Sequence, residues 1–342
     1  MGGRTYRIVL YGLGGVGSAV ARIVARKTSI RIVAAVDTDP AKIGRDVADI
    51  PGLDAPTGVI VAAALPPRLE ADLAIQASTP DLPSIAREIE ALAARKLNVV
   101  SVSGAFYTAA SHPDIARRID EAARGAGVSV YATGATPGFF SDVLPSFVTR
   151  ACARVDSVHV KRTVNMSQWG TGIYDHYGIG WSKDRFDAAA ADGSLKLFDR
   201  LGQSVDYLAA ALGWTLERRD EQKAGFPSAT RRQGNGIVVE PGRICGFSHK
   251  HLGIVAGAPS IVVDYTAIVG LDPALDGEAE QTRITIVGDP GIVLDISGDV
   301  LSDPKSIYQA TAATAVNSVA HVVGAAPGLL RPDSVPVLTP AR

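Results

Sequence analysis

The chain has 342 residues, of which 46% are apolar and 20% are charged, and its formal net charge is -1. This length predicts two domains, and the balance of apolar and charged residues is that of a globular protein. The weak, evenly spread charge excludes a strongly basic nucleic-acid surface, and no apolar stretch is long enough to cross a membrane.

Over residues 1–135, short apolar runs alternate with helical patterns. Most of the runs are continuously apolar, which is typical of strands buried on both faces of a parallel sheet. Amphipathic helices separate them, for example from Leu82, with Pro83 in the first turn, and from Pro113. This alternation predicts an α/β fold with a doubly wound parallel sheet. The expected strands are Arg7–Tyr11, Arg31–Val36, Val59–Ala63, Asp72–Ala77, Val99–Ser103 and Val128–Ala132.

The pattern changes at about residue 140. Longer runs with period-two alternation predict a second, α+β domain built on a mixed or antiparallel sheet. Helices are expected over Lys183–Ala191 and Ser204–Leu212, and a last helix begins at Asp303-Pro304 and ends before Gly324. The predicted strands here are Val155–Val164, Gly236–Ile244, Ser260–Val269, Thr282–Val287 and Ile292–Ile296.

These patterns divide the chain into three parts. Residues 1–140 are expected to form the first domain, and residues 141–303 a second domain that binds the substrate. Residues 304–342 form a C-terminal helix and tail that pack back on the first domain.

A glycine-rich turn follows the first strand directly. In Gly12-Leu13-Gly14-Gly15-Val16-Gly17 the first glycine permits the tight turn, the second lets a pyrophosphate approach the backbone, and the last lets the following helix pack closely. The N-terminus of that helix, Val16–Lys27, offers free N–H groups to phosphates. Asp37 ends the second strand, where an acid binds the adenine ribose. The context on both sides predicts a Rossmann domain that binds a nicotinamide dinucleotide.

The acidic segment Asp37-Thr38-Asp39 bears on the choice of coenzyme. A carboxylate here repels the 2′-phosphate of NADP(H) unless a cation compensates. Lys42 and Arg45 are near in sequence, although such charges are more often solvated. NAD(H) is therefore favoured, and NADP(H) remains an alternative.

Two loops at the carboxyl ends of sheet strands carry small hydroxyl residues. Ser78-Thr79-Pro80 follows the fourth apolar run and Ser103-Gly104 follows the fifth. Ligands of doubly wound sheets bind at this edge, so these residues are expected beside the nicotinamide ribose. Capping of the next helix is the alternative role for Ser78 and Thr79.

Cys152 and Cys245 are isolated and lack CxxC spacing. Two such cysteines predict reduced thiols rather than a disulfide or a zinc site. No signal-peptide pattern is visible, and a cytoplasmic protein is expected.

The segment from Ala132 to Pro145, ATGATPGFFSDVLP, resembles the GTGVNPGF..D.LP signature of the 2,4-diaminopentanoate dehydrogenase and native amine dehydrogenase family. Further similarity covers nearly the whole chain, at Val36–Pro40, Gly193–Gly213, Pro241-Gly242-Arg243 and Asn317–Gly328. The resemblance implies a Rossmann domain like that of dihydrodipicolinate reductases, reductive amination of a ketone or aldehyde and its reverse, and a homodimer.

One departure from the family is clear. The family's Ser-x-x-Glu-Glu segment, whose glutamate is thought to hold the amine, aligns with Ser101-Val102-Ser103-Gly104-Ala105-Phe106-Tyr107. No carboxylate stands there, so an amine-activating acid cannot be carried over.

Candidate residues for proton exchange and substrate binding lie in the glycine-rich, aromatic segment 165–181. Tyr174 and His176 are the catalytic candidates, because a hydroxyl and an imidazole can exchange a proton with the substrate heteroatom. A loop packed by its aromatic rings is the alternative interpretation. The expected substrate-binding residues are Tyr107, Phe139, Phe140, Trp169, Tyr174, His176 and Tyr177.

Two other features are interpreted as structural. Asp142 is expected in the first turn of a helix, where its charge complements the helix dipole. His249-Lys250-His251 is expected in an exposed turn, because no carboxylate or cysteine lies at a metal-site spacing, and no metal is predicted.

The leading hypothesis is an NAD(P)-dependent oxidoreductase that transfers hydride to a C=N or C=O carbon of a small carbonyl or amine substrate. An ammonia-independent imine reductase or alcohol/ketone dehydrogenase is the alternative, given Gly104. A non-catalytic dinucleotide-binding sensor is a third.

Overall fold

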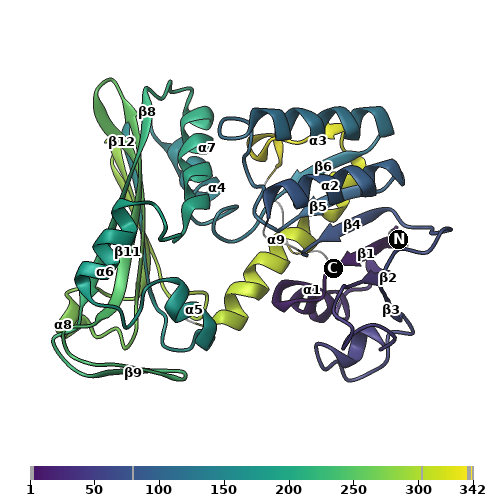
Figure 1. Ribbon diagram of the computed structural model, residues 1–342. Helices are drawn as coiled ribbons and strands as arrows, with labels where there is room; N and C mark the ends of the chain where they lie inside the picture. Colours follow the sequence, from purple (N-terminus) through teal and green to yellow (C-terminus); the bar gives the residue numbers. More distant parts are fainter. Residues whose placement is uncertain (1–3, 79–80, 302, 337–339, 341–342) are drawn as a thin grey trace. The chain divides into compact units, whose positions relative to one another are not determined.

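The computed structural model describes all residues except 1–3, 79–80, 302, 337–339 and 341–342. The chain divides into two compact units. The first comprises residues 1–139 together with 308–342, and the second comprises residues 140–307. We describe each unit by itself (Figure 1).

The first unit is built on a parallel sheet, seven-stranded in the described residues, with the order β15-β6-β5-β4-β1-β2-β3. This confirms the predicted doubly wound sheet, and the strand order reverses between β1 and β4. The strands are β1 (Tyr6–Tyr11), β2 (Ile30–Val36), β3 (Val61–Ala62), β4 (Leu73–Gln76), β5 (Asn98–Ser101), β6 (Ser129–Ala132) and β15 (Gly328–Leu329).

Helices cover both faces of this sheet. One core contains apolar residues of α1 (Gly15–Val24) and of the later turns of α9 (Pro304–Gly324). The other contains residues of α2 (Leu82–Ala94) and α3 (Pro113–Ala126). Burial on two faces explains why the strands are continuously apolar in the sequence.

The second unit is built on a mixed sheet, six-stranded in the described part of the chain, with the order β14-β13-β7-β12-β11-β8. Only β7 and β12 pair in parallel among these strands as described, which confirms the predicted mixed sheet. The strands are β7 (Arg154–Asn165), β8 (Arg218–Pro227), β11 (Ile244–Val255), β12 (Ala258–Ile268), β13 (Gln281–Asp289) and β14 (Ile292–Ile296), and a separate hairpin pairs β9 (Arg232–Gly234) with β10 (Ile237–Val239).

Short helices join the strands of the second unit. They are α4 (Val143–Val148), α5 (Thr171–His176), α6 (Lys183–Ala191), α7 (Gly202–Leu212) and α8 (Pro273–Asp276), with 3-10 turns η2 (Thr149–Ala151) and η3 (Asp199–Leu201). In the first unit, η1 (Val47–Asp49) and η4 (Pro332–Ser334) are further 3-10 turns. The predicted helix N-cap at Asp303 is confirmed, since its carboxylate accepts the N–H groups of Lys305 and Ser306.

The structure corrects the predicted strand Gly236–Ile244. The chain forms β10, turns at Pro241-Gly242 and then begins β11 at Ile244. Proline has no N–H for a strand ladder, and Gly242 has φ +79°, so the segment cannot continue as one strand.

The interpretation of His249-Lys250-His251 as an exposed turn is wrong. These residues lie in the middle of β11, paired with β8 on one side and β12 on the other. Both imidazoles are buried, because alternate residues of β11 face the packed side of the sheet. Strand β8, rich in charged residues, was not predicted at all.

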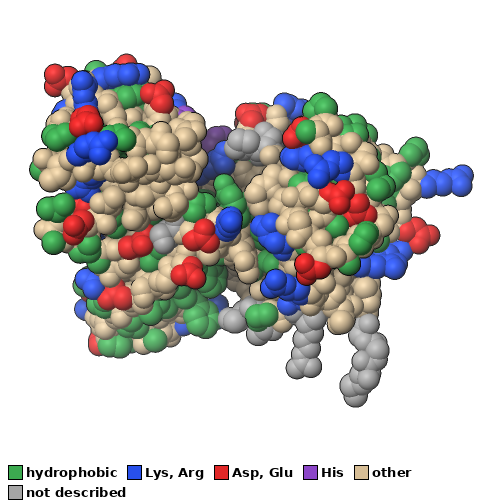
Figure 2. Space-filling model, turned by 90° about the horizontal axis from the view of Figure 1, so that it is seen from below, with side chains coloured by type: hydrophobic (Ala, Val, Ile, Leu, Met, Phe, Trp, Pro, Cys, Tyr) green, Lys and Arg blue, Asp and Glu red, His purple; other side chains and the backbone are tan. Residues whose placement is uncertain are grey.

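Charges of both signs are interspersed on the face that Figure 2 shows, without a large area of one sign. Within the described residues, no helix combines the length and the apolarity that a membrane crossing requires.

Candidate functional site

The glycine turn between β1 and α1 has the geometry of a phosphate-binding loop. Gly12 has φ +99°, and a Cβ there would lie 2.5 Å from the carbonyl oxygen of Ala77. A Cβ at Gly17 would lie 2.0 Å from the oxygen of Gly12, so the helix packs directly on the turn. At Gly14, by contrast, a Cβ would meet nothing within 4 Å, which leaves the backbone open to a ligand.

The first turn of α1 presents its N–H groups at this opening. Gly14 is the N-cap residue and supplies no side-chain hydrogen bond to the helix. The N-terminal N–H groups and the helix dipole favour an anion here. The predicted residues Leu13, Gly15 and Val16 lie in the same turn, where Gly15 packs close to the ring of Tyr308.

Asp37 lies just beyond β2 and is tied to the glycine turn. One carboxylate oxygen accepts the N–H of Leu13 at 2.8 Å, and the other accepts the N–H of Asp39 at 2.9 Å. Burial opposes the ionisation of Asp37, but these hydrogen bonds and the ammonium of Lys42 outweigh it, so the pKa of Asp37 lies below its usual value. Asp37 is therefore a preorganised acceptor, as ribose hydroxyls require.

Lys42 is engaged by the acidic segment rather than turned toward a ligand. Its ammonium lies 3.1 Å from Asp37 and 3.5 Å from Asp39. Arg45 is exposed and contacts the carbonyl of Asp49 at 3.4 Å. Thr38 lies between the two acids and is exposed.

A polar network occupies the carboxyl ends of β4 and β5. Gln76 is completely buried, and its amide nitrogen donates to Ser78 at 2.9 Å and to Glu88 at 2.7 Å. Ser78 also donates to Glu88 in a short hydrogen bond. Ser101 donates to the amide oxygen of Gln76 at 2.6 Å. Glu88 faces this strand end from α2 and was not predicted as a site residue. Its position on the helix that follows the loop is the one feature of the sequence that could have indicated this role.

The predicted residues Ser103, Gly104 and Tyr107 lie in the segment that follows β5. Ser103 lies 3.5 Å from the carbonyl oxygen of Gln76. Gly104 has φ +109°, and Tyr107 is half-buried. Thr79 and Pro80 lie outside the described residues.

The segment that carries the family-like signature crosses from one unit to the other. Gly138 has φ +128°, and a Cβ there would lie 2.1 Å from the nitrogen of Gly134, so the loop closes tightly on itself. Phe139 is the last residue of the first unit and is exposed. Phe140 is the first residue of the second unit, and the guanidinium of Arg162 lies 5.5 Å from its ring.

In the second unit, segment 165–181 contributes to an aromatic cluster. The rings of Trp169 and Tyr177 are 6.2 Å apart, and that of Tyr177 stacks on Phe198 at 5.3 Å. Phe247 and Tyr265 extend the cluster from β11 and β12, although the sequence analysis singled out neither, nor Phe198. Trp169 Nε1 is buried and has no hydrogen-bond partner among the described residues. Such a donor is suited to an acceptor on a bound ligand.

The structure separates the environments of the two catalytic candidates. Tyr174 is buried, and its hydroxyl lies 3.0 Å from the carbonyl oxygens of both Met166 and Ser167. Burial raises the pKa of Tyr174. His176 is exposed, and its ring lies 5.0 Å from that of Tyr177. The geometry favours a structural role for Tyr174, and the catalytic assignment of both residues stays a prediction.

Asp142 lies where the sequence predicted a helix start. It is the N-cap of α4, and its side chain accepts the N–H of Val143 at 2.7 Å. Ser204 donates to its other oxygen at 2.8 Å, so this buried carboxylate also links α4 to α7.

His249 and His251 form a candidate metal group with Glu221, all three ligand atoms lying within 4.8 Å of one another. The tautomers argue against a metal. Phe198 donates its N–H to Nδ1 of His249, so Nε2 carries the proton and points to Glu221 at 3.3 Å. A metal on Nε2 would require the proton at Nδ1, opposite another N–H donor.

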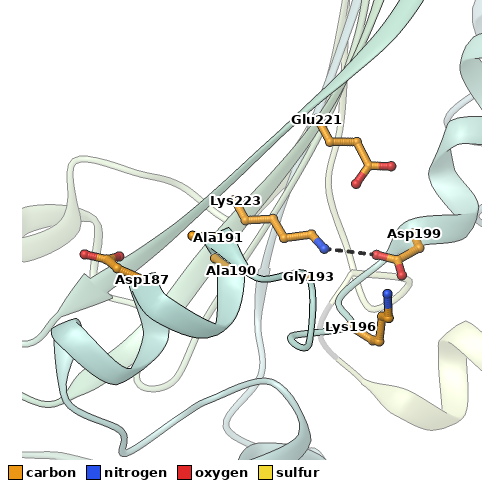
Figure 3. A pocket seen from close by; sticks show the side chains of 8 residues that line it. All are labelled: Asp187, Ala190, Ala191, Gly193, Lys196, Asp199, Glu221 and Lys223. Atoms are coloured by element: carbon orange, nitrogen blue, oxygen red, sulfur yellow. Dashed lines mark ion pairs between the residues drawn. The ribbon is translucent and has the colours of Figure 1, made fainter.

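Glu221 also lines an open cavity of about 620 Å³ (Figure 3). Glu221 and Lys223 come from β8, and Asp199 faces Lys223 at 3.5 Å. Ala190 and Ala191 of α6 also line the cavity. Lys223 and Asp199 form an ion pair within the lining, and none of the predicted site residues is among the residues that line the cavity.

Residues 139–341 match the family model of the 2,4-diaminopentanoate dehydrogenase C-terminal domain, and residues 6–130 match that of the dihydrodipicolinate reductase N-terminus. The chain is 28% identical to 2,4-diaminopentanoate dehydrogenase of Acetoanaerobium sticklandii, over 97% of this chain and 93% of that protein. It is 26% identical to an amine dehydrogenase of Streptomyces virginiae, over 96% of both.

Solved structures share the fold. The amine dehydrogenase from Mycobacterium smegmatis superposes with a TM-score of 0.81 at 24% identity, covering 98% of this chain and 97% of that one. A dipicolinate-bound dihydrodipicolinate reductase from Paenisporosarcina superposes with a TM-score of 0.55 at 12% identity, covering 97% and 100%.

Proposed function

Because the chain belongs to the 2,4-diaminopentanoate dehydrogenase family, we propose that it is a dehydrogenase that interconverts a small ketone or aldehyde and the corresponding amine. The nicotinamide coenzyme supplies the hydride, which adds to the carbon of an iminium formed from the carbonyl compound and ammonia. The observation that carries the proposal is the glycine turn, whose open Gly14 backbone and helix N-terminus lie beside the preorganised carboxylate of Asp37.

We propose NAD(H) as the coenzyme rather than NADP(H). Asp37 offers its remaining lone pairs to two ribose hydroxyls, and a 2′-phosphate would meet the negative charges of Asp37 and Asp39. Lys42 already pairs with both acids, so it is not available to compensate. The other cation of segment 37–45 is Arg45, which follows Lys42 by three residues and is exposed.

We propose that the aromatic cluster of the second unit forms the substrate wall. Trp169, Tyr177 and Phe198 supply apolar surface that excludes water from a reacting C=N bond. Trp169 Nε1 supplies a buried donor for a substrate acceptor. Tyr107, Phe139 and Phe140 remain proposed substrate contacts on the same grounds as in the sequence analysis.

His176 is the residue we propose for proton exchange at the substrate nitrogen or oxygen. It is exposed, and an imidazole can both donate and accept a proton. Tyr174 would hold the segment that carries His176, since its hydroxyl is bound by two carbonyl oxygens of the preceding turn.

A second candidate is an ammonia-independent imine reductase or alcohol/ketone dehydrogenase. The observation that favours it is Gly104, which stands where the family's sequence has a glutamate and whose φ of +109° suits glycine rather than a carboxylate residue. Such an enzyme would reduce preformed cyclic imines or ketones without ammonium.

One experiment separates these candidates. NADH oxidation is followed with a panel of small ketones, aldehydes and cyclic imines, each with and without ammonium. Ammonium-dependent turnover of ketones or aldehydes supports the first proposal, and equal rates without ammonium support the second. No turnover of any compound under either condition would overturn both.

We also propose that the protein forms a homodimer through the sheet of the second unit. Val287 of β13 and Val293 of β14 are large apolar side chains exposed on neighbouring strands, as at a surface that a second copy covers. Light scattering coupled to size exclusion measures the mass directly, and a monomer at micromolar concentration would contradict the proposal.

A further inference from the structure

We propose that Glu88 is a positioning residue of the coenzyme site. Through Ser78 it orients the nicotinamide ribose, and its negative charge makes the site bind NAD⁺ more tightly relative to NADH. This inference rests on the proposed dinucleotide-dependent function and assigns part of it to one side chain of α2.

The hydrogen bonds around Glu88 determine which group is the donor in each pair of the network. Ser101 donates to the amide oxygen of Gln76, so the amide nitrogen of Gln76 must face the other way, toward Ser78 and Glu88. Gln76 and Ser101 are completely buried, so this orientation is locked by packing. Glu88 thus accepts one hydrogen bond from Gln76 and one from Ser78.

This arrangement leaves Ser78 as an acceptor. Its single hydroxyl proton is directed to Glu88, and one of its lone pairs accepts from Gln76. The second lone pair is available on an exposed side chain. A ribose hydroxyl is a donor that matches it.

The position of Ser78 in the sheet indicates which ribose it meets. In the strand order, β1 lies between β2 and β4. Asp37 follows β2 on one side of the glycine turn, and Ser78 follows β4 on the other. A Cβ on Gly12 would lie 2.7 Å from the Cα of Ser78, so the two loops are in contact. A dinucleotide with its adenosine at Asp37 and its pyrophosphate at the turn therefore places its nicotinamide ribose at Ser78.

Glu88 also brings a charge that discriminates between the two forms of the coenzyme. The nicotinamide ring is cationic in NAD⁺ and neutral in NADH. No Lys or Arg of the described residues forms an ion pair with Glu88, so its charge is not cancelled by a direct partner. The same charge acts at the end of β1, where burial first, and then Glu88, raises the pKa of Tyr11. A carboxylate close to the nicotinamide would stabilise the oxidised ring selectively.

The test compares coenzyme affinities of variants by fluorescence titration. Replacing Glu88 with glutamine keeps the size and one oxygen that can accept from Gln76 and Ser78, but removes the charge. The ratio Kd(NAD⁺)/Kd(NADH) is expected to rise about 3- to 10-fold in Glu88→Gln, as a partly screened charge interaction implies. In Ser78→Ala, which keeps the charge, both Kd values should rise while their ratio stays near that of the wild type.

Glu90→Gln is the matched control, because Glu90 lies on the same helix and pairs with Arg118 at 2.8 Å instead. It should leave the ratio unchanged. If Glu88→Gln folds poorly, as judged by its melting temperature, Glu88→Asp serves instead. Because this variant retains the charge, it should keep the wild-type ratio of Kd values while binding both NAD⁺ and NADH more weakly.

The outcomes separate this inference from the proposed function. Wild-type protein that binds neither coenzyme would overturn the proposed function itself. Wild-type binding together with an unchanged ratio in Glu88→Gln, or a ratio altered equally in Glu90→Gln, would overturn only the role of Glu88.

Discussion

The carboxylate of Asp37 accepts the backbone N–H of Leu13 at 2.8 Å, and this one bond joins the end of β2 to the turn that follows β1. The side chain that we propose for ribose binding thereby also shapes the loop that we propose for the pyrophosphate. The two parts of the proposed coenzyme site are therefore linked, and a change at Asp37 should affect both.

Replacing Asp37 with serine should weaken NADH binding about 10- to 100-fold, because charge-assisted hydrogen bonds to the ribose are lost. NADPH should be affected less, since the repulsion of its 2′-phosphate is also removed. Fluorescence titration with both coenzymes measures the change. The exposed Asp49→Ser variant is the control, and equal losses for NADH and NADPH would argue against ribose recognition by Asp37.

The glycines of the turn should respond differently to alanine. Gly17→Ala places a methyl group 2.0 Å from a carbonyl oxygen, so it should destabilise the fold by at least about 1–3 kcal/mol. Gly14→Ala meets nothing within 4 Å, so it should keep its stability but bind NADH more weakly, because the methyl group faces the expected pyrophosphate. Urea unfolding and coenzyme titration distinguish the two, and full NADH affinity in Gly14→Ala would contradict the placement of the pyrophosphate.

Substitution of Tyr174 should mainly lower stability, whereas substitution of His176 should mainly lower catalysis. Tyr174→Phe removes the donor that two buried carbonyls share, so it should cost about 1–3 kcal/mol of stability with little change in kcat. His176→Ala should leave the melting temperature unchanged but lower kcat about 100-fold or more, the usual contribution of an acid–base group. A large kcat loss in Tyr174→Phe at unchanged stability would restore the original assignment of Tyr174 as the catalytic acid.

The buried histidines should make the protein sensitive to mild acid. Burial lowers the pKa of His249 to about 4, and burial also lowers the pKa of His251. Since the unfolded state takes up these protons near pH 6.5 and the folded state does not, stability is full above that pH and falls as the pH drops toward 4. Urea unfolding at pH 7 and pH 5 measures the loss.

A His251→Gln variant provides the check on that pH dependence. It should be less stable than the wild type at pH 7, since a packed side chain is changed, but it should lose less stability between pH 7 and pH 5. An equal loss in the variant would assign the acid sensitivity to other groups.

The sequence alone determined the features that depend on residues close together in the chain. The turn after the first strand needs glycine because Gly12 adopts a positive φ and Gly17 touches Gly12, and both constraints act within six positions of one another. The apolar runs of the first unit predicted its parallel sheet, since strands buried on both faces cannot alternate. The signature around Pro137-Gly138 likewise indicated the family, which the comparisons confirm.

Tertiary structure decided which distant side chains meet. Glu88 faces Ser78 because α2 folds back over the end of β4, and Phe198, Phe247 and Tyr265 join Trp169 only when the second sheet is assembled. His249 and His251 are buried because they lie on the packed face of β11, against Phe198. A hydrophobic or charged pattern indicates on which face of its own helix or strand a residue lies. What that face contacts depends on how the helix or strand packs in the folded chain, and no local pattern encodes this packing.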